Sequence, residues 1–323
     1  MEHQEIDEPA LLEPTNFTPP ARTPWGGHRI RALKGLPGGP RVGESWELSI
    51  EPSFPSELAD GRRLDALAPD CALLVKLLDA QDALSVQIHP SDDDPTLGPG
   101  EAGKPEAWYV VDREPGAGLW IGLTEDADEA RVRACLDAGG DLSALLPFVP
   151  VEPGDFFSIE AGTPHCIGPG VFLVEPQRVS PGKRGLTYRY WDWNRTYDAA
   201  GRRDPGGAPR ALHVEEALRV TRWDLPRGEA LLDRIRVRAG APALGGAPTR
   251  RVLVDGPPLS VARLGGDGVV DLPPRPTLAA LTVLAGAVEL GSIRVGAGRS
   301  AAVPAGWTGS ARLRAAHALM SST

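Results

Sequence analysis

Short apolar runs separated by glycine and proline are the feature of this sequence that most constrains its fold. The 38 Gly and 33 Pro residues are spread along the 323-residue chain rather than gathered into one tract. Glycine and proline mark turns and interrupt helices, so this spacing predicts many strands joined by turns. The sequence therefore predicts an all-β protein, with strands expected at residues 45–50, 73–77, 84–88, 107–111, 118–121, 156–159, 171–174 and 186–191.

Two segments have helical rather than strand character. Residues 124–138 start with Thr124 as a candidate N-cap, carry acidic residues in the first turn and are followed by Gly139-Gly140 as a stop signal. A second helix is expected to begin near His213. The first of these predicts a small helical insertion, at about residues 124–148, within an otherwise β-rich unit.

Composition changes along the chain predict its domain organisation. Residues 1–20 are rich in proline and acidic groups without periodicity, and we expect a loose N-terminal leader there. From residue 228 the charge density falls and Ala, Gly, Val and Leu alternate. We therefore expect a first domain at 21–227, which contains the helical insertion, and a second β-sandwich domain at 228–323.

An internal repeat supports two related units. Residues 151–165 align without a gap on residues 295–309, so that Gly154 matches Gly298 and Ala161-Gly162 matches Ala305-Gly306. A turn glycine, a short strand and a second turn in the same register predict two copies of one β-sandwich, although Gly-rich turns also match by chance. The last aligned position holds His165 in the first copy and glycine in the second.

Charge and cysteine content exclude several classes of protein. The 34 Lys and Arg against 43 Asp and Glu give a formal charge of −9, which argues against nucleic-acid binding. No stretch reaches the roughly 20 apolar residues that a bilayer crossing needs, so no membrane span is expected. The acidic N-terminal residues lack the pattern of a secretory signal, which predicts a cytoplasmic protein. The three cysteines fit neither a disulfide framework nor a thiolate zinc cluster.

Four side chains form a candidate metal site. Gln87 and His89 lie two residues apart on an expected strand, so they share one face. Glu106 stands at the start of another expected strand, and His165 follows a third. Two imidazoles, a carboxylate and an amide oxygen suit a divalent ion such as zinc, and catalytic zinc sites keep one position open. The alternative is that these are ordinary hydrogen-bonded side chains.

Six motifs in order make residues 23–220 resemble the type I mannose-6-phosphate isomerases, the cupin-fold phosphomannose isomerase family. They are Trp25-Gly26-Gly27, Gly43-Glu44-Ser45-Trp46-Glu47, Leu84-Ser85-Val86-Gln87-Ile88-His89-Pro90, Gly103-Lys104-Pro105-Glu106-Ala107-Trp108-Tyr109, Gly154-Asp155 with Ala161-Gly162-Thr163-Pro164-His165, and Thr187-Tyr188-Arg189.

The resemblance implies two cupin or jelly-roll-like sandwiches, with the metal ligands in the first only. It implies one Zn²⁺ per chain, held by Gln87, His89, Glu106 and His165. It also implies a catalytic role for Arg189, whose guanidinium stays protonated and offers positive charge to a developing oxyanion.

Two further residues are candidates for the reaction. Lys104 lies two residues before Glu106, where it would bind substrate oxygens or assist proton transfer; the alternative is a surface lysine. Glu175 matches a family carboxylate near the site and is a candidate proton shuttle, with a structural glutamate as the alternative.

The implied activity is a metal-dependent aldose-ketose isomerase that interconverts mannose 6-phosphate and fructose 6-phosphate through an enediol. Its partner would be a small sugar phosphate, and the chain a monomer or homodimer. Family members carry Ser-Asp shortly before Thr-Tyr-Arg, whereas residues 175–189 lack that Asp and carry Arg178, Lys183 and Arg184. Two alternatives therefore stay open: an isomerase of another phosphosugar, and a non-catalytic metal-binding cupin that senses or binds a sugar phosphate.

Overall fold

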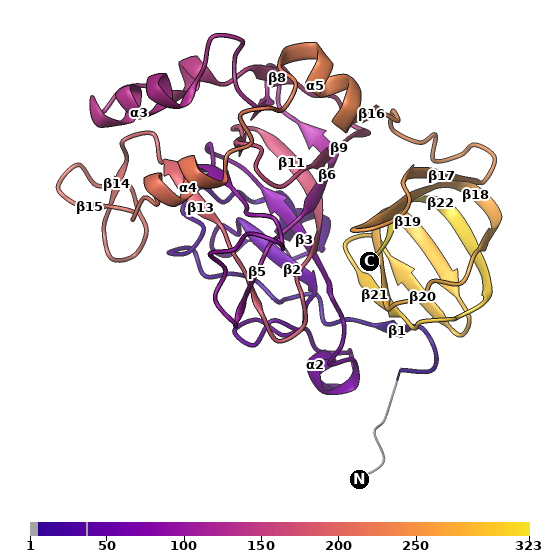
Figure 1. The fold of residues 1–323 in the computed structure, drawn as a ribbon. Helices are drawn as coiled ribbons and strands as arrows, with labels where there is room; N and C mark the ends of the chain where they lie inside the picture. Colours follow the sequence, from indigo (N-terminus) through magenta and orange to yellow (C-terminus); the bar gives the residue numbers. More distant parts are fainter. Residues whose placement is uncertain (1–5, 37) are drawn as a thin grey trace.

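Three large antiparallel sheets form the body of the protein (Figure 1). The structure is a computed structural model and describes residues 6–36 and 38–323. Residues 1–5, the start of the expected leader, lie outside the described residues. Two of the sheets build the first unit, and the third builds the C-terminal unit, which stands beside the first in Figure 1.

The first unit is a sandwich whose two sheets face each other. The rings of His165, from one sheet, and Trp108, from the other, lie 5.2 Å apart between centroids. The six-stranded sheet has the order β16 (Arg236–Arg238), β9 (Asp155–Ile159), β6 (Glu106–Arg113), β11 (Val171–Arg178), β3 (Leu73–Asp79) and β2 (Glu44–Leu48). The five-stranded sheet has the order β13 (Tyr188–Trp191), β4 (Val86–Ile88), β10 (His165–Ile167), β7 (Gly118–Ile121) and β8 (Phe148–Pro150).

All eight strands expected from the sequence are present, with ends shifted by one to four residues at most positions. The sequence predicted no bounds for the strands of the C-terminal unit, and most of the short strands were not expected, because two or three residues are too few to show a period. Besides β8, β10 and β16, the unexpected short strands include two small pairs: β5 (Glu101–Ala102) with β12 (Arg184–Gly185), and β14 (Thr196–Tyr197) with β15 (Ala208–Pro209).

The expected helical insertion contains a helix that begins later than predicted. Helix α3 (Glu129–Asp137) starts after Asp128, whose side chain accepts a hydrogen bond from the amide of Arg131 at 2.8 Å. Thr124 is therefore not the N-cap; Asp128, four residues later, caps the helix, and aspartate is the preferred residue of the two at this position. The other helices are α1 (Arg29–Leu33), α2 (Leu64–Leu67), the 3₁₀ turn η1 (Leu142–Leu145), α4 (Val214–Val220) and α5 (Gly228–Ile235).

The C-terminal unit is one seven-stranded sheet that curls around its own core. Its order is β1 (Ala10–Leu11), β21 (Ser300–Val303), β19 (Ala279–Leu290), β22 (Gly309–Ser322), β18 (Ser260–Leu272) and β17 (Thr249–Val254), with β20 (Ile293–Gly296) paired to β19. Strand β1 comes from the segment expected to be a leader, and the following Leu12 is buried. Residues 228–238 form α5 and β16, and β16 pairs with β9 of the first unit. The boundary at residue 227 stays a prediction.

A shared apolar core joins the two units. Side chains on the outer face of the six-stranded sheet, such as Tyr109 and Phe156, pack in one cluster with Leu259, Leu284 and Leu319 of the C-terminal sheet. Burial of this surface stabilises the pairing of the units, at roughly 25 cal/mol per Å² of apolar area. The inner face of the six-stranded sheet is left for the other sheet of the first unit.

The internal repeat corresponds to equivalent local structure in both units. Gly154 and Gly298 both have positive φ, at 92° and 75°, and each precedes a short strand, β9 or β21. Gly162 and Gly306 follow those strands, again with positive φ. Glycine adopts this backbone readily because it lacks a Cβ, which explains why both units carry glycine at these two turns.

The helices of the described residues are short. The longest, α3, has nine residues, and none combines the length and apolarity that a membrane crossing requires.

Candidate metal centre

Three strands bring the candidate ligands to one place between the two sheets. Strand β6 begins with Glu106, β10 begins with His165, and His89 follows the last residue of β4. His165 lies opposite Gln87 in the β10–β4 ladder. Because His89 is two residues after Gln87, an extended backbone places both on the face toward His165.

The ligand atoms of His89, Glu106 and His165 all lie within 4.8 Å of one another. Nε2 of His89 is 3.1 Å from one carboxylate oxygen of Glu106, and Nε2 of His165 is 3.3 Å from the other. The three residues are 2%, 2% and 0% exposed. A buried carboxylate thus stands between two buried imidazoles that belong to the opposite sheet.

Hydrogen bonds on the far side of each ring define the chemistry of this group. Nδ1 of His89 lies 2.9 Å from the carbonyl of Leu186, and Nδ1 of His165 lies 2.8 Å from that of Thr163. A carbonyl oxygen only accepts, so each Nδ1 carries the ring proton and each Nε2 of a neutral ring presents a lone pair. Metal-binding histidines are held in this way.

The three residues fit a divalent cation. Both Nε2 atoms and one carboxylate oxygen of Glu106 are buried and have no hydrogen-bond partner among the residues that the structure describes. Two nitrogen lone pairs that point at a carboxylate are repelled by its negative charge, and a cation between the three groups removes this repulsion. Buried polar atoms are also rarely left unpaired. Nitrogen and oxygen donors of this kind suit zinc and its neighbours in the transition series. We conclude that the group has the donor set of a metal site.

Charges around the group favour this state. Burial and the positive charge of Lys104 lower the pKa of His89 to about 4, so the ring is neutral near pH 7. Burial alone would raise the pKa of Glu106, but the nearby ammonium of Lys104 and the two imidazoles together outweigh it and hold the pKa well below its usual range. Nζ of Lys104 lies 3.3 Å from Glu106 and is nearly buried. Lys104 is therefore part of this inner cluster rather than an exposed lysine.

Gln87, the fourth expected ligand, stands next to the group on the strand ladder. It is the register partner of His165 on one side and of Arg189 on the other, and its exposure is intermediate. Its role as an oxygen ligand stays a prediction.

Gln177 is a neighbour of the group that the sequence analysis did not select. Its Nε2 donates to Glu106 at 2.8 Å, the residue is fully buried, and its Oε1 has no hydrogen-bond partner. The donated bond fixes one carboxylate oxygen and leaves the other toward His165. The period of two was the available signal, because Gln177 follows Glu175 by two residues on β11 and so shares its face.

Glu175 lies one row away from the group on the same inner face. Nε1 of Trp108 donates to its carboxylate at 3.0 Å, and Nζ of Lys76 lies 3.6 Å from it. Burial, together with the negative charge of Glu106, raises the pKa of Glu175 to about 7. A carboxyl group with a pKa near neutrality can both accept and release a proton.

The pKa of Glu175 predicts a pH dependence of stability in the metal-free protein. Between its usual value and about 7, the folded chain binds a proton at Glu175 that the unfolded chain releases. The free energy of unfolding should therefore fall as pH rises through this window, by at most about 3 kcal/mol from this group. Denaturant unfolding of the wild type and Glu175→Gln at pH 4.5 to 8 isolates the effect, because other titrating groups are common to both. Parallel curves for the two proteins would contradict it.

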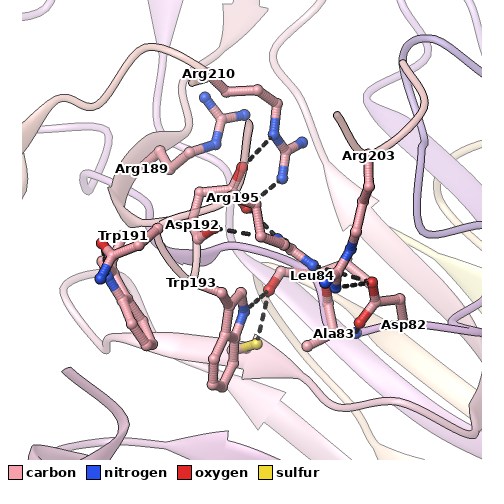
Figure 2. Close-up of polar contacts among 12 residues, drawn as sticks. Asp82, Ala83, Leu84, Arg189, Trp191, Asp192, Trp193, Arg195, Arg203 and Arg210 are labelled. Carbon is pink, nitrogen blue, oxygen red and sulfur yellow. Dashed lines mark hydrogen bonds and ion pairs between the residues drawn. The ribbon is translucent and has the colours of Figure 1, made fainter. Parts of the chain in front are cut away.

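Arg189 occupies the edge strand β13, beside the group but not among its direct contacts. Its backbone is the partner of Gln87, so it stands two strands from His165, at a spacing of roughly 10 Å between backbones. Its guanidinium donates to the carbonyl of Ala211 at 2.8 Å and lies beside Arg210 (Figure 2). Burial, followed by the charge of Arg210, lowers the pKa of Arg189.

Two of the three basic residues of the altered loop, Arg178 and Arg184, are engaged with acidic partners. Arg178 forms an ion pair with Asp92, and Arg184 donates to Glu101 at 2.8 Å. These pairs hold the loop against the segments that follow β4 and precede β6. A phosphate contact by either residue would have to compete with a carboxylate.

Fold and site together define a class: a cupin-type β-sandwich with a buried His-Glu-His group suited to a metal ion. No profile of a protein family matches the chain. The chain is similar to the mannose-6-phosphate isomerase of Streptococcus mutans, with 36% identity over 214 residues, which is 61% of this chain and 63% of that protein. The match spans less than two thirds of the relative's length. It confirms the resemblance expected from the motifs.

Solved structures agree on the fold. The mannose 6-phosphate isomerase of Bacillus subtilis superposes with a TM-score of 0.77 at 22% identity, covering 98% of this chain and 100% of that one. A mannose 6-phosphate isomerase bound with zinc and yttrium gives a TM-score of 0.66 at 14% identity, covering 98% and 100%. The all-β, cupin-like fold class is thereby confirmed.

Proposed function

We propose that this protein is a zinc-dependent isomerase that interconverts mannose 6-phosphate and fructose 6-phosphate. The single observation that carries the proposal is the buried group of His89, Glu106 and His165, whose unpaired nitrogen and oxygen atoms converge within 4.8 Å. The similarity to an isomerase of Streptococcus mutans supports the substrate class.

The reaction removes a proton from the carbon next to a carbonyl and returns a proton to the carbonyl carbon, through an enediol. A divalent ion at this group would polarise the carbonyl oxygen and stabilise the charge that develops on it. Around it, the chain supplies Lys104, whose ammonium binds substrate oxygens, and Arg189, whose guanidinium stabilises the developing oxyanion. Glu175, with its pKa near 7, carries a proton between the carbons.

Residues that do not touch substrate hold these groups in place. Gln177 orients the carboxylate of Glu106, and the carbonyls of Leu186 and Thr163 orient the two imidazoles. The sheets exclude water from all three ligands, which strengthens every electrostatic interaction among them.

Metal analysis coupled to an isomerase assay tests the proposal. We expect one zinc per purified chain, conversion of mannose 6-phosphate to fructose 6-phosphate, loss of turnover on chelation and recovery on addition of zinc. A panel of other aldose phosphates measures specificity. Zinc retention with sugar-phosphate binding but without turnover of any substrate would favour a binding protein and reject the enzyme.

The monomeric or dimeric state and the cytoplasmic location expected from the sequence stay predictions. Gel filtration with light scattering measures the first, and fractionation of the source cells the second.

A further inference from the structure

A short segment runs along the free edge of β13 and contacts Arg189 directly. This strap, residues 208–213, connects β14–β15 to helix α4. The amide of His213 donates to the carbonyl of Arg189 at 2.8 Å, and the amide of Arg189 donates to Nδ1 of His213 at 3.1 Å. The carbonyl of Ala211 accepts from the Arg189 guanidinium at 2.8 Å. The strap therefore contacts both the backbone and the side chain of Arg189.

One buried carboxylate anchors the strap to the strand (Figure 2). Arg210, next to Ala211, donates through Nε and Nη2 to the two oxygens of Asp192, at 2.7 and 2.6 Å. Asp192 is 4% exposed, and Arg195 also binds it, through an ion pair and a bond to its carbonyl at 3.1 Å. Bidentate pairs of this geometry are strong and directional, because two parallel bonds fix the guanidinium plane. Asp192 follows Arg189 by three residues, so the carboxylate that holds the strap and the arginine that the strap contacts lie at the same end of β13.

Charge balance makes the anchor necessary. The Asp192 carboxylate lies among three arginines, Arg189, Arg195 and Arg210 (Figure 2). Arg210 is the charged group with the largest effect on Arg189, and the two cations repel each other. Nε of Arg189 is buried without a hydrogen-bond partner. Its guanidinium is thus held by the Ala211 carbonyl, whose position depends on Arg210.

We propose that Asp192 and Arg210 are positioning residues that fix the Arg189 guanidinium through the carbonyl of Ala211. The inference rests on the proposed function, because it assigns the pair a role in turnover through Arg189. Neither residue has to touch the substrate for this role. A displacement of Arg189 of about 1 Å is enough to lower turnover substantially.

The first test measures the position of Arg189 without any turnover. Arginine side chains labelled with ¹⁵N give Nε–H signals, and the Arg189 signal is identified by its loss in Arg189→Ala. In the zinc-loaded protein we expect Arg210→Ala and Asp192→Asn to broaden or shift this signal and to speed its solvent exchange about tenfold or more. Arg202→Ala is the matched control, since Arg202 is exposed and pairs with Asp198 outside the strap. An unchanged Arg189 signal in both variants would overturn the inference, whatever the activity of the protein.

The second test is a double-substitution cycle on turnover. If Arg210 acts through Arg189, Arg210→Ala lowers kcat by about tenfold to a hundredfold with KM and zinc content nearly unchanged. The same substitution in an Arg189→Ala background should then lower kcat no further, whereas a general structural defect would add its full effect. Additive losses would reject the inference, and an Arg189→Ala variant of full activity would reject the proposed role of Arg189 instead.

Two further variants keep the cycle interpretable if Arg210→Ala is poorly folded. Arg210→Lys keeps the charge but loses the bidentate geometry, and we expect a partial loss of kcat at wild-type thermal stability. Equal kcat for Arg210→Lys and the wild type, together with an unchanged Arg189 signal, would contradict the positioning role.

Discussion

Glu106→Gln should lose its metal and, with it, at least a hundredfold of turnover. The substitution keeps the shape of the side chain and removes the negative charge that stands between the two imidazoles, 3.1 and 3.3 Å from their Nε2 atoms. A neutral amide is a far weaker ligand for a divalent ion, and its NH₂ group competes with the ion for the histidine lone pairs. Metal content by mass spectrometry and kcat of the same preparation measure the effect.

A matched control separates the metal from general effects of the substitution. Glu101→Gln removes a carboxylate that pairs with Arg184 at the protein surface, and it should keep full metal content. Circular dichroism should show both variants folded, because the sandwich packs around apolar residues rather than around the ion. A Glu106→Gln protein that retains one metal per chain would contradict the assignment of this group as the metal site.

The largest expected effect on stability belongs to Glu47, at the junction of the two units. Glu47→Ala should lower the free energy of unfolding by about 3–5 kcal/mol. The Glu47 carboxylate accepts from Lys34 at 2.9 Å, from Ser45 at 2.6 Å and from Ser300 of the C-terminal unit at 2.8 Å. The Lys34 side chain is completely buried, so the alanine variant leaves an ammonium group with the carbonyl of Gly298 as its remaining partner.

Denaturant unfolding of three variants checks the origin of this loss. Glu152→Ala breaks an exposed ion pair with Arg113 and should cost less than about 1 kcal/mol. The double variant Lys34→Met with Glu47→Leu removes both charges and should be more stable than Glu47→Ala alone, because no buried charge is left unpaired. If the double variant were as unstable as the single one, packing rather than the ion pair would explain the loss.

The motifs on which the resemblance rests contain residues with different physical roles, and only the structure shows which role each residue has. A Cβ at Gly26 would lie 2.4 Å from the amide nitrogen of Gly43, and one at Gly27 would lie 2.4 Å from the carboxylate of Asp79. Gly26 thus allows two backbones to approach closely, and Gly27 leaves room for the Asp79 side chain, so both serve packing rather than chemistry. Glu47 likewise joins two units. In contrast, His89, Glu106 and His165 meet at one point between the two sheets, and their role as metal ligands stays a prediction.

Sequence reasoning was weakest where partners lie far apart in the chain. It placed Gln87 and His89 on one face, because the period of a strand is a local property. It did not find Gln177 beside Glu106, or the anchor between Asp192 and Arg210. Each of these contacts depends on which strand or loop lies next to which, and alternation along one strand carries no information about that order.

By itself, the sequence determined the all-β character, the positions of the longer strands of the first unit and the glycine turns of the repeat. Each of these follows from backbone preferences and side-chain periods within a few residues. Tertiary structure alone decided which amide orients the Glu106 carboxylate, which carbonyl holds the His89 ring and which loop holds Arg189. Those contacts join residues up to 97 positions apart, as between His89 and Leu186, and they form only when the sheets pack and bury them together.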